Sequence, residues 1–254
     1  MITNIWQRLV GSSRAEARVP DGYRVYAIGD IHGRLDLLQA IHTKILRDAA
    51  SSPSALSKAA VYLGDYVDRG LQSKEVIDLL LDSPLPGFDT VHLKGNHEEA
   101  MLEFLEDASV GPGWLRFGGN ETLYSYGVRV PTDVPAAERP RQLQIALREA
   151  LPQSHVKFLS SLRLSLVIGD YAFVHAGIRP GVTMDKQVAE DLLWIRGDFL
   201  DSKRDHGKVI VHGHTITREP AICANRIGID TGAYASNVLS CLVLEGSSRR
   251  VITS

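Results

Sequence analysis

The sequence is short of cysteine, of long apolar runs and of excess charge, and each shortage excludes a class of protein. Only Cys223 and Cys241 occur among 254 residues. Two cysteines are too few for a disulfide framework, so we expect a reducing compartment, the cytoplasm, with both side chains packed in apolar, strand-like surroundings. No apolar run approaches the length of about 18 residues that a membrane span needs. The net charge of −2 provides no basic surface for extended binding of nucleic acid.

The length and composition favour one large soluble domain, residues 1–254. Residues 1–22 form an N-terminal extension without the apolar stretch of a signal peptide. Within it, apolar residues between Ile2 and Val10 predict a short helix packed on the body, and residues 14–22 predict a linker. We expect no membrane partner, and the sequence leaves the oligomeric state open.

Strands and helices alternate through the first hundred residues, which favours a parallel, right-handed βαβ sheet. Residues 107–161 then lack a clear strand or motif, and they contain a helical stretch from Glu138 to Leu151. We expect a mainly helical insert over the site. After it the chain is rich in β signals, beginning with a hairpin at Gly169-Asp170. One parallel and one antiparallel half predict an α/β fold, with two mixed sheets packed face to face and flanked by helices. The predicted helices are 35–50, 73–81 and 98–105, and the predicted late strands are 164–168, 171–175, 221–223, 226–229, 238–244 and 250–252.

Five short apolar runs each end at glycine and at a side chain that can bind a metal ion. Ligands of α/β sheets gather outside the carboxyl ends of the strands, so these side chains should meet at one place. The five segments after the runs are Gly29-Asp30-Ile31-His32-Gly33, Gly64-Asp65-Tyr66-Val67-Asp68-Arg69-Gly70, Gly95-Asn96-His97-Glu98, His175-Ala176-Gly177 and His212-Gly213-His214-Thr215.

This set of side chains predicts a hydrolytic site with two metal ions. Asp30 and His32 are two residues apart and can hold one ion, and Asp65 can bridge both. The second ion would be completed by Asn96, His175 and His214. Hard oxygen and imidazole ligands without thiolate favour Mn, with Fe or Zn as alternatives. Such a pair of ions would carry a bridging hydroxide that attacks phosphorus in line.

Other side chains in the same segments suit the remaining steps. Arg69 can hold two phosphate oxygens, and Arg196 is a second candidate for this contact. Asp68 can orient His97 as the general acid for the leaving alkoxide. The alternatives are a structural salt bridge for either arginine and a helix-capping role for the Asn96-His97 pair. The sequence also leaves open whether His212 touches the site, and it favours a structural turn at 230–232.

These blocks resemble the phosphoprotein phosphatase branch of the calcineurin-like metallophosphoesterases, above all the bacterial and bacteriophage-type Ser/Thr protein phosphatases. The matching segments lie between residues 29 and 215, and Ile229-Asp230-Thr231-Gly232-Ala233 extends the likeness. The resemblance implies an α/β/β/α sandwich and a Mn-dependent or Fe/Zn-dependent phosphomonoesterase. By matched position it implies the metal ligands named above, His97 with Asp68 as the acid pair, and Arg69, Asn96 and Arg196 as phosphate contacts. The implied substrate is a phosphoprotein or phosphopeptide.

Two other functions compete with this interpretation. A symmetrical dinucleoside tetraphosphate hydrolase shares the fold, but that branch has Ala in place of Asp68 and Asp in place of Glu98. An inactive scaffold that binds partner proteins is a remote alternative, since all six predicted ligands are present. The segments 1–22 and 107–161 match nothing recognisable, so the sequence leaves the physiological substrate and the native metal open.

Overall fold

The computed structural model describes residues 16–51, 56–82, 85–129 and 134–254. The helix expected between Ile2 and Val10 lies outside these residues. The end of the N-terminal extension is part of the body rather than a linker, because Ala17 and Val19 are buried in the core. The backbone N–H of Val19 also donates to the carbonyl of Gly246, at 3.0 Å.

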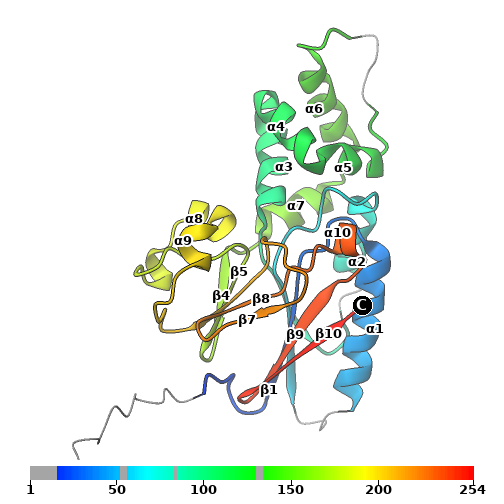
Figure 1. The fold of residues 1–254 in the computed structure, drawn as a ribbon. Coiled ribbons are helices and arrows are strands. Elements are labelled where there is room, and N and C mark those ends of the chain that lie inside the picture. Colours follow the sequence, from blue (N-terminus) through cyan, green and yellow to red (C-terminus); the bar gives the residue numbers. More distant parts are fainter. Residues whose placement is uncertain (1–15, 52–55, 83–84, 130–133) are drawn as a thin grey trace, which may run out of the picture.

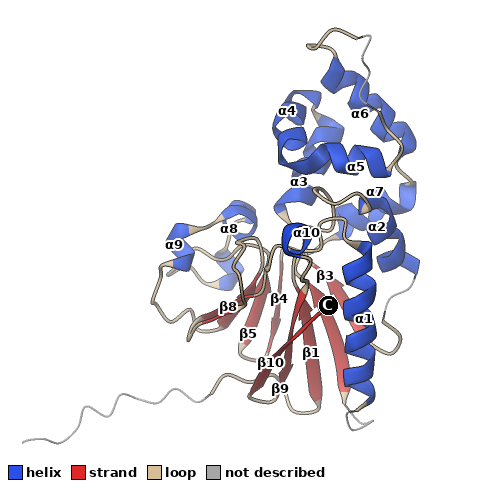
Figure 2. Cartoon of the chain, turned by 45° about the vertical axis from the view of Figure 1, so that its right-hand side comes forward, coloured by secondary structure: helices blue, strands red, loops and turns tan. Residues whose placement is uncertain are grey.

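Two five-stranded sheets form the centre of the molecule (Figures 1 and 2). The first has the order β10-β9-β1-β2-β3, and the second has the order β4-β5-β6-β8-β7. The strands of the first are β1 (Tyr23–Ile28), β2 (Ser57–Tyr62), β3 (Asp89–His92), β9 (Ser240–Glu245) and β10 (Ser248–Thr253). Those of the second are β4 (Ser165–Ile168), β5 (Tyr171–Val174), β6 (Val209–His212), β7 (Ala221–Ile222) and β8 (Arg226–Gly228).

Each sheet is mixed, so the expected fold class is confirmed, but the assignment of one strand direction to each half of the chain is wrong. In the first sheet β1, β2 and β3 are parallel, and the C-terminal hairpin of β9 and β10 pairs antiparallel with β1. In the second sheet β5, β6 and β8 are parallel between antiparallel edge strands. The physical reason is that β1 is buried, so its second edge needs a hydrogen-bonding partner, which the end of the chain supplies.

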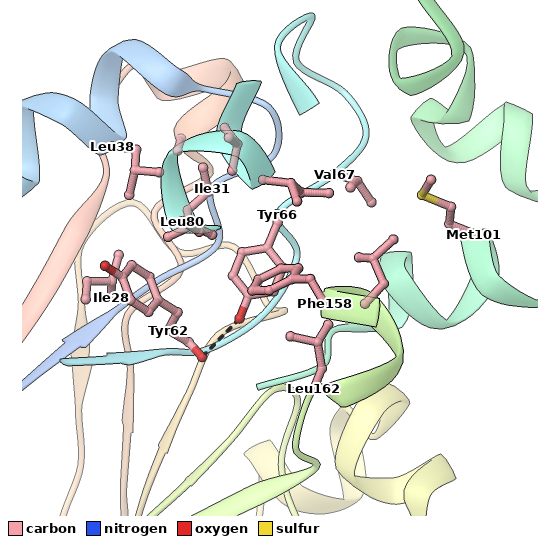
Figure 3. Packing of buried hydrophobic residues seen from close by; sticks show 14 of the residues in the cluster. Ile28, Ile31, Leu38, Tyr62, Tyr66, Val67, Leu80, Met101, Phe158 and Leu162 are labelled. Carbon is pink, nitrogen blue, oxygen red and sulfur yellow. Dashed lines mark hydrogen bonds between the residues drawn. The ribbon is translucent and has the colours of Figure 1, made fainter. Parts of the chain in front are cut away.

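Alternation along the strands divides the core into two layers. Val25 and Ala27 of β1 face the second sheet, where they belong to one apolar cluster with Phe173 and Val211. Tyr26 and Ile28 face the other way, toward the helices. Figure 3 shows part of that outer layer. The dashed line marks the hydrogen bond that the Tyr66 hydroxyl donates to the backbone carbonyl of Tyr62, at 3.5 Å.

The three helices of the first half are α1 (Leu35–Ala50), α2 (Ser73–Asp82) and α3 (Asn96–Glu106), close to the predicted bounds. Helices α1 and α2 lie on the outer face of the first sheet, and α3 extends beyond the end of β3, among the helices that follow it (Figures 1 and 2). Leu38, Ile41 and Ile45 recur at helical spacing on α1 and are fully buried. Beside the second sheet lie η3 (Met184–Lys186), α8 (Ala189–Trp194) and α9 (Gly197–Leu200), and α10 (Ala233–Ser236) precedes β9.

The described residues between 107 and 161, which leave out 130–133, are mainly helical and stand at the end of the sandwich where the strands of the first half finish (Figures 1 and 2). The pieces are η1 (Ala108–Val110), α4 (Gly111–Trp114), η2 (Leu115–Gly119), α5 (Asn120–Ser125), α6 (Arg139–Ala150) and α7 (Gln153–Ser161). The segment η2 is interrupted by a kink at Gly118, whose φ of 113° is not helical.

The structure bears on two expectations: the burial of the two cysteines and the absence of a membrane-spanning helix. Cys241 is buried in β9, but Cys223 is partly exposed, so the prediction of two buried cysteines is wrong for Cys223. Cys223 directly follows β7, which lies at the edge of the second sheet, where side chains reach solvent. Over the residues described here, no helix has the length and apolarity required to cross a membrane.

Candidate metal centre and phosphate pocket

The predicted ligands sit on sharp backbone turns that follow the strands. His32, Asp65 and His214 have φ of 47°, 53° and 62°, in the left-handed region that side chains other than glycine rarely adopt. Glycines let the carboxylates approach the neighbouring backbone: a Cβ on Gly95 would lie 2.0 Å from Asp65 Oδ1, and one on Gly213 would lie 2.0 Å from Asp30 Oδ1. The glycines of the motifs therefore make room for the ligands.

Asp65 lies at the centre of two groups of possible metal donors. The first is His32, Asp65 and His97, and the second is Asp65, His175 and His214. The carboxylate oxygens of Asp65 lie 3.4 Å from His32 Nε2 and 3.4 Å from His175 Nε2. Asn96 joins the second group, since its Oδ1 is 2.9 Å from His175 Nε2 and 2.8 Å from His214 Nδ1. One carboxylate shared by two groups is the arrangement that a bridging ligand requires.

Asp30 lies beside these groups and belongs to neither of them. Its Oδ2 accepts the backbone N–H of His214 at 2.9 Å, which places it next to the second group. Its buried Oδ1 has no hydrogen-bond partner among the described residues, and the same is true of His214 Nε2. Buried polar atoms are almost always paired, so these two atoms fit a site that binds cations.

The electrostatics of the cluster also fit divalent cations. Burial lowers the pKa of His32 to about 3 and that of His214 to about 2, so both imidazoles are neutral and keep a lone pair for a metal ion. Burial would raise the pKa of Asp65, but the surrounding histidines outweigh it and the pKa lies below its usual range. A carboxylate, an amide oxygen and neutral imidazoles without thiolate suit Mn, Fe or Zn.

His97 and Asp68 form a buried hydrogen-bonded pair at the edge of the cluster. His97 Nδ1 is 2.6 Å from Asp68 Oδ2, which assigns the Nδ1 proton to the side facing the carboxylate. Burial lowers the pKa of His97, but Asp65 and Asp68 raise it by more, so the net pKa lies above its ordinary value. His97 Nε2 is 3.9 Å from Asp65, so the ring lies next to the predicted metal site without being a predicted ligand.

Two residues of the insert hold Asp68, and sequence reasoning missed both. Trp114 Nε1–H donates to Asp68 Oδ2 at 2.9 Å, and the Thr122 hydroxyl donates to Asp68 Oδ1 at 2.6 Å. The backbone N–H of Asp68 donates in turn to Thr122 Oγ1 at 2.8 Å. No local pattern around Trp114 or Thr122 indicates these contacts, because the partner lies far away in the sequence.

Glu98 holds the backbone of the turns that carry the predicted metal ligands. This buried carboxylate accepts the backbone N–H groups of Asp65 and Gly95, each at 2.9 Å, and that of Tyr66 at 2.7 Å. Burial raises its pKa to about 7. The sequence placed Glu98 in the Gly95-Asn96-His97-Glu98 block but gave it no role; the structure shows that it joins two of the five segments.

The two predicted phosphate-binding arginines line one pocket of about 290 Å³ together with Asp65, Asn96, His97 and His214. The Arg69 guanidinium donates to His97 Nε2 at 3.2 Å and lies over the ring of Tyr234, 4.7 Å from its centroid. Arg196 donates to the Thr215 hydroxyl at 3.3 Å. Both cations therefore face the predicted metal ligands.

His212 and the 230–232 turn lie outside this pocket. The His212 ring packs on Phe199, with 5.1 Å between ring centroids, and not on the metal ligands. At the turn, Asp230 Oδ1 accepts the backbone N–H of Gly232 at 2.8 Å, which is the structural bond expected there. Asp230 is nevertheless close enough to Asp30 for its charge to raise the pKa of that carboxylate, after burial itself.

Residues 23–233 match the calcineurin-like phosphoesterase family, and the chain belongs to that family. It is 29% identical over 228 residues to serine/threonine-protein phosphatase 2 of Escherichia coli K12, covering 85% of this chain and 90% of the relative. It is 26% identical over 233 residues to bis(5'-nucleosyl)-tetraphosphatase PrpE [asymmetrical] of Bacillus mycoides KBAB4, covering 85% and 88%. The structure of a cold-active protein tyrosine phosphatase shares the fold, with a TM-score of 0.58, 20% identity and coverage of 92% and 81%.

The family and the donor set together define a metal-dependent phosphoesterase. The named relatives act on different substrates, a phosphoprotein and dinucleoside tetraphosphates. Membership of the family therefore supports hydrolysis at a phosphate group and does not define the substrate.

Proposed function

We propose that the protein is a phosphomonoesterase with two divalent metal ions, Mn or else Fe or Zn, and that it removes phosphate from serine and threonine side chains of proteins. The observation that carries this proposal is the Asp68–His97 pair beside the two donor groups. A serine or threonine alkoxide is a poor leaving group and needs a proton in the transition state. In a dinucleoside tetraphosphate the group that leaves is a nucleotide, through a phosphate oxygen, which is a much better leaving group than an alkoxide and needs no proton.

The metal ions, when bound by Asp30, His32, Asp65, Asn96, His175 and His214, supply an activated water and polarise the phosphoryl oxygens. The residues of the chain do the rest. Arg69 and Arg196 hold the phosphate and orient it for in-line attack. When Arg69 turns to the phosphate, His97 Nε2 is free to carry the proton that it delivers to the leaving oxygen. Asp68 stabilises the imidazolium and fixes the ring.

Replacing His97 with Asn tests the proposal. General acid assistance is worth about 10²–10⁴-fold, so we expect His97→Asn to lose at least about a hundredfold in kcat/KM on a phosphoserine peptide and on phenyl phosphate. The loss on p-nitrophenyl phosphate should be much smaller, because p-nitrophenolate leaves without a proton. Elemental analysis of both proteins after loading with Mn should give about two ions per chain, by the predicted donor set. Equal losses on all three substrates, with metal retained, would contradict the role of His97.

A dinucleoside tetraphosphate hydrolase is the second candidate, and its support comes from the PrpE relatives. Initial rates with Mn on phosphoserine peptides and on diadenosine tetraphosphate separate the two functions. A higher kcat/KM on the phosphopeptides supports the phosphatase. The opposite ranking would transfer the assignment to the nucleotide hydrolase.

A further inference from the structure

The pocket beside the predicted metal ligands has two chemically different ends. Its inner end carries Arg69 and Arg196 beside the donor groups. Its outer end, defined here by the pocket-lining residues of α3 beyond Asn96, begins at the apolar side chain of Ala100. Phe117 of the insert and Trp194 of α8 add further apolar lining and are 62% and 45% exposed. A substrate that suits both ends of the pocket therefore carries one phosphate on a largely apolar group.

One carboxylate interrupts the apolar end. Asn96, Ala100 and Glu103 recur at i, i+4 and i+7 of α3, so they share a face of the helix, and all three line the pocket. With a rise of 1.5 Å per residue, the backbone of Glu103 lies about 10 Å outward from that of Asn96. Glu103 is exposed, and within the described part of the chain no lysine, arginine or histidine pairs with its carboxylate. Its charge is therefore free to act on a bound substrate.

We propose that Glu103 determines specificity by repelling negative charge attached beyond the phosphate that is hydrolysed. Nucleoside polyphosphates are thereby disfavoured, and monoesters whose leaving group is apolar or flanked by positive charge are favoured. Arg69 and Arg196 both lie at the inner end of the pocket, next to the reacting phosphate. The outer end offers further phosphates a carboxylate and apolar walls. This inference deepens the proposed function and rests on hydrolysis of the ester at this site.

The size of the effect follows from Coulomb's law. A unit charge about 7 Å from another, in largely aqueous surroundings, changes an interaction about two- to threefold, and physiological salt weakens it further. A tetraphosphate places several charges beyond the one attacked. We therefore expect Glu103→Gln to raise the ratio of kcat/KM on diadenosine tetraphosphate to kcat/KM on p-nitrophenyl phosphate about tenfold, and Glu103→Lys to raise it further.

Glu106→Gln is the matched control. Glu106 lies on the same helix and is exposed; unlike Glu103 it pairs with Arg148, at 3.4 Å, and it does not line the pocket, so the same loss of charge should leave the ratio unchanged. The rise in Glu103→Gln should shrink as salt is added, because mobile ions screen the repulsion. On phosphoserine peptides the same substitution should reduce the preference for arginine over glutamate beside the phosphoserine.

The outcomes separate the two proposals. If the wild-type protein loaded with Mn does not hydrolyse p-nitrophenyl phosphate, the proposed function is wrong. If it does, and neither Glu103→Gln nor Glu103→Lys moves the ratio beyond Glu106→Gln, Glu103 does not set specificity. A ratio that rises in Glu103→Gln and in Glu106→Gln alike would also overturn the inference, since it would show an effect of net charge.

Discussion

Replacing Thr122 with Val tests whether the helical insert holds the carboxylate of Asp68. The Thr122 hydroxyl is buried, donates to Asp68 Oδ1 at 2.6 Å and accepts the backbone N–H of Asp68 at 2.8 Å. Valine keeps the shape of the side chain and removes both bonds. A hydrogen bond to a charged group contributes about 1.5–3 kcal/mol. Trp114 and Ser73 still contact Asp68, so the loss should fall at the low end, equivalent to about tenfold in rate.

The assay compares leaving groups in the Mn-loaded protein. We expect Thr122→Val to lose about tenfold in kcat/KM on phenyl phosphate and much less on p-nitrophenyl phosphate, because only the first needs the proton from His97. Thr122→Ser should restore the rate. Ser125→Ala is the control, since that hydroxyl is on the same helix and donates to the Thr122 carbonyl instead of to Asp68. Equal losses on both substrates, or a loss in Ser125→Ala of the same size, would refute the reasoning.

Two further predictions concern backbone and pH. Gly118→Ala should lower both stability and kcat/KM, because its Cβ would lie 2.6 Å from the backbone N of Arg69; Gly127→Ala shares a positive φ but has open space, so it should lose stability alone. Burial lowers the pKa of His42 to about 4, below its usual 6.5, so the unfolded chain binds the extra proton as pH falls from about 6.5 to 4 and stability falls with it. His42→Gln should reduce that decline by about 2 kcal/mol between pH 7.5 and pH 5, measured by urea unfolding of metal-free protein. An unchanged dependence of the unfolding free energy on pH would exclude His42 as its source.

Local pattern was enough to predict the elements that carry the site. The bounds of α1 are those that the spacing of Leu38, Ile41 and Ile45 predicts, and the turn at Gly169-Asp170 joins an antiparallel pair as expected. The predicted ligand segments also meet, because parallel strands bring their carboxyl ends to one edge. These patterns are local: the type and spacing of neighbouring residues are enough to predict which side chains are buried and where the chain turns.

Pairings over long range could not be predicted in the same way. The continuous apolar run of β9 indicates that its side chains are buried but not that the strand pairs with the edge of β1. Trp114 and Thr122 look like ordinary residues of a helical segment, and their hydrogen bonds to Asp68 exist only once the insert is docked. Periodicity identifies a buried face, and it carries no information about which element covers that face.

The strained turns show why the insert matters to the chemistry as well as to the shape of the pocket. Asp68 and Arg69 have φ of 72° and 66°, and such conformations cost of order 1–3 kcal/mol each. They persist only where surrounding bonds fix them, and here the insert supplies those bonds: Thr122 accepts the N–H of Asp68, and the Gly118 carbonyl accepts that of Arg69 at 3.2 Å. Phe117 immediately precedes Gly118 in the insert, and it lines the pocket. Substitution at Phe117 is therefore expected to alter substrate preference while the bonds that hold Arg69 and the proposed Asp68–His97 acid pair stay in place.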